Sequence, residues 1–238
     1  MLLRRSHDIS RLEAFSDAVF AFALTLLVVA LEVPKSYDEL MKLMGGFLSF
    51  ACCFSVLLLI WYEHNLFFRR YGMSDPYTVV LNGGLLFVVM FYVYPLKFMF
   101  DSWFALFIRF PHKEIVPMSL TQMSSASAIY GLGFFLLFVM FALLYLHAYG
   151  KRKELGLQPL DVFDVRMYLG RHIVSAGVGL LALGIALFGP KRYGFVSPMS
   201  FALMGPAHWS YQAWADRKRK RFEAKLTTEP NDAAVPQS

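Results

Sequence analysis

Long apolar runs separated by short polar segments are the main feature of this chain. A helix that crosses a membrane needs about 20 mostly apolar residues. Pro198 and Pro206 fall inside the last of these runs and interrupt a regular helix there. The pattern predicts an all-α, polytopic membrane protein with six transmembrane helices. The expected spans are Ala14–Val33, Leu43–Tyr62, Tyr77–Phe100, Ala126–Leu146, His172–Gly189 and Gly194–Trp214.

Two segments beside these spans refine the prediction. Ser10 and Glu13 have the spacing of a capping box, so the first helix is expected to begin near Ser10 and to be retained rather than cleaved. The aromatic stretch Phe98–Phe110 is interrupted by Asp101 and Arg109. We interpret it as the outer end of the third span followed by an interfacial segment, with a re-entrant loop as the alternative.

Composition supports a membrane protein. Of the 238 residues, 57% are hydrophobic and only 17% are charged. A soluble domain carries about 25% charged residues, so a water-soluble or disordered chain is excluded. Residues 1–225 are expected to form one transmembrane domain, and residues 226–238 a disordered tail. The adjacent Cys52 and Cys53 provide neither a disulfide framework nor a metal site.

The basic residues predict the orientation in the membrane. With six spans, 16 of the 23 Lys and Arg residues fall on the side that holds both termini. The positive-inside rule places that side in the cytoplasm, as in a multi-pass protein of the inner or plasma membrane. The basic segment Arg217–Arg221 is expected to anchor this topology, with binding of anionic lipid as the alternative. Because the basic clusters lie between apolar runs, nucleic acid is not an expected partner.

Three polar side chains in the first three spans are expected at about one depth, with a fourth within one helical turn of them. Asp17 lies seven residues after Ser10, or about 10 Å along the helix. His64 lies near the end of the second span, with Trp61 one turn deeper, and Asn82 lies near the start of the third. Because polar groups in a membrane require partners, we predict an interhelical polar clamp. A proton relay between Asp17 and His64 is the alternative.

These residues also carry a resemblance to a known family. The motif Arg-x-x-x-Phe-Ser-Asp, followed by Trp-x-x-His and an Asn, resembles the signature of the transmembrane protein 175 family of potassium channels. The resemblance covers about the first hundred residues. It implies a six-helix repeat around a central pore lined by the first helix and, for a chain with one repeat, a prokaryotic homotetramer. The matching residues are Arg11, Phe15, Ser16, Asp17, Trp61, His64 and Asn82.

The resemblance further implies which residues line the pore. Phe22, Leu26 and Val29 take the positions of the family's hydrophobic constriction, and Thr25 lies beside them. The family usually has isoleucine or leucine there, so four Phe22 rings are expected to narrow the pore or to change its selectivity. From periodicity alone, the alternative is a helix buried in a bundle, with Thr25 bonded to the carbonyl of Ala21.

Small residues recur at helical spacing in the fifth span, at Ser175, Gly179, Ala182 and Ala186. They allow a second helix to approach closely. The pattern is equally compatible with packing inside one subunit and with packing between subunits.

Catalytic and metal-binding motifs are lacking, so neither an enzyme nor a bound cofactor or metal is expected. The leading interpretation is a homotetrameric channel for passive cation conduction, with K⁺ as the permeant ion. The first alternative is a proton-coupled small-solute transporter that uses Asp17 and His64. The second is a non-conducting membrane interaction protein whose pore is plugged by Phe22.

Overall fold

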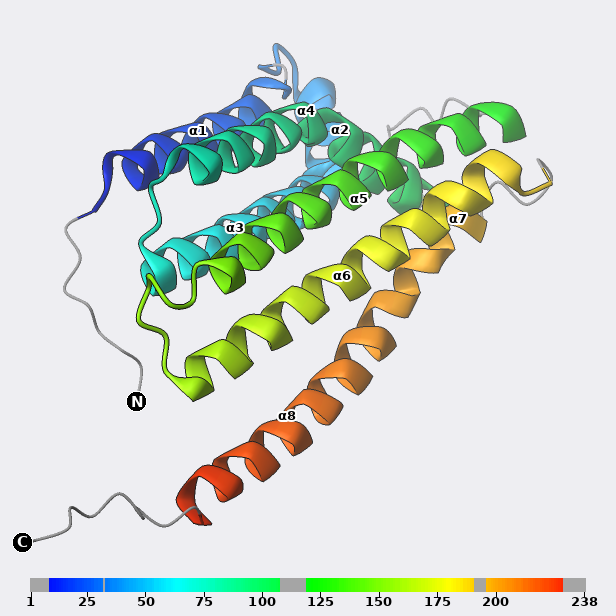
Figure 1. The fold of residues 1–238 in the computed structure, drawn as a ribbon. Coiled ribbons are helices and arrows are strands. Elements are labelled where there is room, and N and C mark those ends of the chain that lie inside the picture. The colour runs from blue at the N-terminus through cyan, green and yellow to red at the C-terminus, as the bar shows by residue number, and fades with distance from the viewer. Residues whose placement is uncertain (1–8, 32, 108–118, 191–195, 229–238) are drawn as a thin grey trace, which may run out of the picture.

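The computed structural model describes residues 9–31, 33–107, 119–190 and 196–228 (Figure 1). Every regular element in these ranges is helical. In chain order they are α1 (Arg11–Val29), α2 (Tyr37–Gly45), α3 (Phe47–Tyr71), α4 (Pro76–Phe107), α5 (Leu120–Gly150), α6 (Pro159–Phe188), α7 (Val196–Met199), the short 3₁₀ helix η2 (Ser200–Leu203) and α8 (Met204–Thr228).

Within the described ranges, five helices are long and apolar enough to cross a membrane, namely α1, α3, α4, α5 and α6. The protein is therefore an all-α, multi-pass membrane protein, as the sequence predicts. The expected sixth span, Gly194–Trp214, is not one continuous helix, because α7, η2 and α8 follow one another across it. Its first residues, 194 and 195, lie outside the described residues, and a sixth crossing stays a prediction.

The ends of the first helix follow local chemistry. Ser10 Oγ accepts a hydrogen bond from the Glu13 amide at 3.2 Å, and the Glu13 carboxylate accepts one from the Ser10 amide at 2.8 Å. This confirms the expected capping box. The helix ends at Val29 and not at the expected Val33. Pro34 explains part of the difference, because a residue that precedes proline is disfavoured in a helix.

The second and third spans also differ from their expected bounds. Leu43 belongs to the short helix α2, and the spanning helix α3 begins only at Phe47. Two consecutive glycines, the second of which is Gly46, the C-cap of α2, separate the two helices. Glycine has a low helix propensity, which favours a break there. At the other end of the next span, α4 continues without a break through Phe107. The described part of the aromatic stretch is thus helical, whereas residues 108–110 lie outside the described residues.

The last helix carries the basic segment along the first turns of α6, where Arg219 pairs with Asp164 at 3.1 Å. In Figure 1, α8 runs back along α6, and its final turns extend beyond the start of α6. Because α8 continues to Thr228, it includes the first residues of the segment 226–238 that was expected to be disordered. Residues 229–238 of that segment lie outside the described residues.

The helices form a bundle in which α1 lies at one edge (Figure 1). The helix α4 packs against α1, α3 and α5, whereas α1 packs against α3 and α4. The most extensive packing joins α5 and α6. There a Cβ atom on Gly179 would lie 2.9 Å from the backbone nitrogen of Phe135, so glycine permits the close approach. Gly179, together with the buried Ser175 and Ala182, thus serves packing within this chain.

A charged cluster joins the loop before α4 to the end of α5. The Asp75 carboxylate accepts hydrogen bonds from Thr78 Oγ1 at 2.8 Å and His147 Nε2 at 3.0 Å, and Lys151 Nζ lies 3.6 Å away. Partial burial alone would raise the pKa of Asp75, but the hydrogen bonds from Thr78 and His147 outweigh this effect. They lower the pKa of Asp75 to about 2. The cluster therefore stabilises this end of the bundle while Asp75 is ionised.

Candidate pore helix and its polar network

The edge helix α1 has two contrasting faces. One face packs against α3 and α4 and is buried, at Ser16, Phe20, Ala23 and Leu27. The other face is apolar but exposed in the single chain. Phe15, Phe22 and Val29 are 59%, 55% and 70% exposed. A broad apolar surface on a membrane helix is expected to contact lipid, another subunit or a pore.

Five of the nine exposed residues of α1 form a regular stripe. Phe15, Ala18, Phe22, Thr25 and Val29 are all exposed, and they follow one another at alternating steps of three and four residues. This seven-residue repeat is typical of helices that pack around a common axis. We call these five residues the α1 stripe.

The residues expected to line a pore have different environments. Phe22, Thr25 and Val29 belong to the α1 stripe, whereas Leu26 is only partly exposed. Thr25 Oγ1 donates a hydrogen bond to the carbonyl oxygen of Ala21 at 2.9 Å. By contrast Phe20, two residues from Phe22 and about 200° around the helix, is only 2% exposed.

The first interhelical hydrogen bond on the packed side of α1 involves Asp17. Trp61 Nε1, on α3, donates to Asp17 Oδ1 at 2.8 Å. Both side chains are partly buried. The bond provides a partner for a carboxyl group that lies two turns inside a membrane helix, and it links α1 to α3.

A second set of hydrogen bonds joins three helices. Asn82 Nδ2 donates to Ser16 Oγ at 2.9 Å, and Ser16 Oγ donates to the carbonyl of Leu12 at 2.8 Å. Because the Asn82 amide nitrogen is the donor, Asn82 Oδ1 is left as an acceptor for His64 Nε2 at 2.8 Å. Ser16, His64 and Asn82 are all at most 1% exposed. The His64 ring also lies against Phe20, with ring centres 5.4 Å apart.

The structure thus places Asp17, Trp61, His64 and Asn82 at the contact of α1, α3 and α4, but it pairs them in two separate sets. A direct proton relay requires a hydrogen bond between Asp17 and His64. The described side chains form no such bond. Ser16, one of the signature residues, is the acceptor for Asn82, and the sequence did not specify this pairing. Its position next to Asp17 on the buried face of α1 was the available signal.

Two residues of the family signature do not take part in the polar network. Arg11 and Phe15 are both exposed, and neither side chain makes a hydrogen bond among those that the described residues form. Arg11 lies in the first turn of α1, and Phe15 belongs to the α1 stripe. Their side chains leave α1 on the side away from α3 and α4, so helix geometry separates them from Ser16.

The other end of α1 has a partner that the sequence did not indicate. Lys97 Nζ, on α4, donates to the carbonyl oxygen of Ala30, the C-cap residue of α1, at 3.1 Å. The last carbonyls of a helix lack partners within the helix and attract positive charge. In the sequence, the only signal for this contact was a lysine near the outer end of an apolar span. Among the described residues, no group of His, Cys, Asp or Glu side chains is placed to hold a metal ion.

The fold and this site define a multi-pass helical membrane protein in which buried hydrogen bonds hold an edge helix with an exposed apolar stripe. Comparison with known sequences identifies its relatives. The family model described as endosomal/lysosomal potassium channel TMEM175 matches residues 11–92. A potassium channel of Marivirga tractuosa is 36% identical over 197 residues, which are 78% of each chain. The chain therefore belongs to the TMEM175 family.

Other relatives agree with this assignment. A potassium channel of Chamaesiphon minutus is 26% identical over 187 residues, which are 75% of this chain and 84% of the relative. Among solved structures, a variant of the potassium channel MtTMEM175 bound to a nanobody fusion has a TM-score of 0.80 and 32% identity. That match covers 91% of this chain and 97% of the channel. A lysosomal potassium-selective TMEM175 homologue from Chamaesiphon minutus, at a TM-score of 0.57 and 24% identity, shares the fold.

Proposed function

We propose that this protein forms a potassium channel in which the α1 stripe lines the conduction pathway of a homotetramer. The observation that carries the proposal is the exposed seven-residue repeat of Phe15, Ala18, Phe22, Thr25 and Val29 on an edge helix. Family membership supports it, because the relatives described above are named potassium channels. In this proposal K⁺ is the permeant ion, and the protein is not an enzyme and uses no cofactor.

The α1 stripe supplies a hydrophobic constriction. Four Phe22 side chains around one axis form its narrowest point, since Phe22 is the largest residue in the middle of the stripe. Apolar walls offer water no hydrogen bonds, so the neck loses water readily. An ion that crosses it loses hydration that the walls do not replace. Thr25, one turn farther along, provides a polar atom next to this neck.

The polar network has a positioning role in this proposal. The bonds of Asp17 and Ser16 to α3 and α4 set the rotation of α1, and Lys97 holds its far end. These contacts lie on the packed side of the helix. They therefore present the α1 stripe to the axis without themselves lining the pathway.

Orientation and assembly are part of the same proposal. Both termini are cytoplasmic, in the inner or plasma membrane, and α7, η2 and the start of α8 make the sixth crossing. Figure 1 supports an even number of crossings, since the start of α1 and the end of α8 lie on the same side of the bundle. The basic segment Arg217–Arg221 then lies at the anionic cytoplasmic surface.

Reconstitution in liposomes with an outward K⁺ gradient tests the function. We expect K⁺ efflux from the wild type and faster, less selective efflux from Phe22→Ala, because the neck becomes wider. The matched control is Phe20→Ala, which changes a buried phenylalanine on the same helix. It is expected to lower thermal stability without changing the preference for K⁺ over Na⁺.

The two alternative functions predict different outcomes of this experiment. Flux that requires a proton gradient and disappears in Asp17→Asn would indicate a proton-coupled transporter. Absence of flux from wild type and from Phe22→Ala would indicate a non-conducting protein. Equal flux and equal selectivity in wild type and Phe22→Ala would show that this face does not line the pathway.

A further inference from the structure

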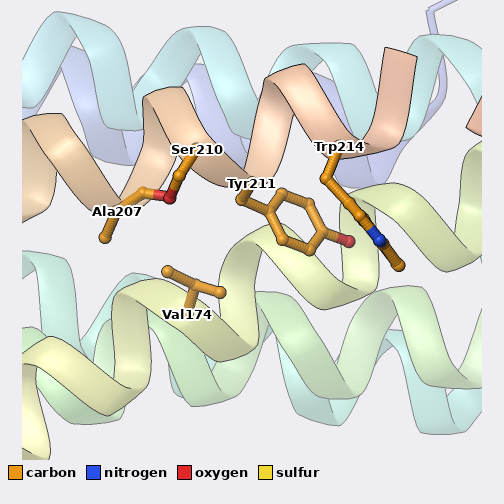
Figure 2. A pocket seen from close by; sticks show the side chains of 5 residues that line it. All are labelled: Val174, Ala207, Ser210, Tyr211 and Trp214. Carbon is orange, nitrogen blue, oxygen red and sulfur yellow. The ribbon is translucent and has the colours of Figure 1, made fainter. Parts of the chain in front are cut away.

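An apolar groove lies between α6 and α8, away from the α1 stripe. It has a volume of about 490 Å³ and is lined by Val174 of α6 and by Ala207, Ser210, Tyr211 and Trp214 of α8. Figure 2 shows the Tyr211 ring across the groove, with Val174 and Trp214 directed into the space between the helices. The groove is open along one side and is not an enclosed cavity.

The wall formed by Tyr211 is fixed in place. Tyr211 Oη donates to the carbonyl oxygen of Met167 at 2.9 Å, so its only polar atom already has a partner. Gly170 allows this contact, because a Cβ atom there would lie 2.1 Å from Tyr211 Oη. The Tyr211 ring is therefore held across α6, with its hydroxyl group directed to the α6 backbone.

A positive charge lies at one end of the groove. Lys218 follows Trp214 by one turn, and its Nζ lies 4.1 Å from the centre of the Trp214 ring. Among the described side chains Lys218 makes no ion pair, whereas its neighbour Arg219 is paired with Asp164 at 3.1 Å. Ala207, Tyr211, Trp214 and Lys218 follow one another at steps of four, three and four residues. One face of α8 thus changes from apolar to cationic along its length.

An apolar surface that ends at a positive charge matches the chemistry of an anionic phospholipid. An acyl chain requires an apolar channel, and an anionic headgroup requires a positive charge at the end of that channel. Tryptophan and tyrosine are enriched at the depth where the two parts of a lipid meet. The exposed basic segment Arg217–Arg221, which follows Trp214 in α8, raises the local concentration of anionic lipid.

We propose that the groove between α6 and α8 binds one anionic phospholipid of the cytoplasmic leaflet. Its acyl chain lies along Val174, Tyr211 and Trp214, and its phosphate pairs with the Lys218 ammonium. The site rests on the proposed orientation of the protein in the membrane, but it does not rest on conduction.

Quenching of tryptophan fluorescence by brominated lipids tests the site in the full-length protein. The protein is reconstituted in phosphatidylcholine vesicles that contain increasing fractions of acyl-brominated phosphatidylglycerol or, in parallel, acyl-brominated phosphatidylcholine. The expected result is saturable quenching by phosphatidylglycerol at fractions where phosphatidylcholine has little effect. Trp214→Phe should remove this saturable part. Unbrominated phosphatidylglycerol should compete, whereas inorganic phosphate should not.

Two lysines provide a matched pair of variants. Lys218→Gln is expected to raise the half-saturating fraction of phosphatidylglycerol about fivefold, because it removes the direct ion pair with the phosphate. Lys220→Gln makes the same change about 200° around α8 and is expected to change it less than about twofold. Val174→Phe keeps every charge, fills the groove, and should remove the preference for phosphatidylglycerol.

Three results would overturn the proposal. Equal quenching by the two lipids would show no headgroup recognition. Equal effects of Lys218→Gln and Lys220→Gln would show that the basic segment attracts lipid only as a diffuse charge. Absence of quenching of Trp214 by either lipid would show that another part of the assembly covers the groove. Because quenching needs no ion flux, a protein that binds the lipid but passes no K⁺ would contradict only the proposed function.

Discussion

Substitution of Asn82 by leucine tests whether the buried hydrogen bonds hold α1 in place. Leucine has nearly the same shape, so the change removes polar atoms without opening a large cavity. It removes the bond to Ser16 Oγ, worth about 0.6–1 kcal/mol for polar contacts between membrane helices. It also leaves the His64 Nε2–H without an acceptor in a site that is 1% exposed, which costs about 1–3 kcal/mol. We expect a loss of about 2–4 kcal/mol in the free energy of unfolding.

The assay is reversible unfolding in mixed micelles of increasing SDS content, followed by tryptophan fluorescence. The control is Asn65→Leu, the same change on α3 at a residue without a hydrogen bond among those of the described side chains. The double variant His64→Phe with Asn82→Leu removes both partners, and replacing both by apolar groups of similar shape is nearly neutral. The double variant should recover at least half of the free energy of unfolding that Asn82→Leu loses. A stability within about 0.5 kcal/mol of wild type for Asn82→Leu would refute the assigned bonds.

Three further predictions follow from contacts outside the Asn82 hydrogen bonds. Asp75 has its pKa lowered to about 2, so its stabilising effect is present above about pH 4 and is lost as the pH falls toward 2. In acid titrations followed by circular dichroism, Asp75→Asn should lose about 2 kcal/mol at neutral pH and lack this acid-dependent loss. Gly179→Ala should cost about 1–3 kcal/mol in thermal unfolding because of overpacking, whereas Gly177→Ala, with open space around its Cβ, should be neutral or stabilising. Lys97→Met should increase hydrogen exchange at the last turn of α1, whereas Lys97→Arg should preserve its protection; equal exchange in wild type and Lys97→Met would contradict the cap.

Local signals in the sequence predicted the helices well and their ends less well. The capping box at Ser10 is a contact between residues three apart, so the sequence contains it completely. The break between α2 and α3 at Gly46 was missed, because the apolar run continues through the glycines. The α7–η2–α8 segment was expected as one interrupted span, but hydropathy does not show how an interrupted helix continues.

The candidate site shows a similar division. The sequence indicated that Asp17, His64 and Asn82 lie at about one depth, with Trp61 one turn deeper, because depth follows from counting residues along a helix. It did not indicate that Trp61 bonds Asp17 while Asn82 bonds His64. The choice of partner depends on the rotation and offset of each helix, which are set by packing across the bundle.

The sequence by itself determined the class of the protein, the approximate positions of five spans, and the separation of Phe20 from Phe22 on opposite sides of the first helix. These properties follow from hydrophobicity, span length and helical periodicity, which act over neighbouring residues. Only the tertiary structure decided that the side bearing Phe20 is buried and that the side bearing Phe22 is exposed. That outcome depends on α3 and α4, which cover one side of α1 and leave the other free for contacts beyond the chain.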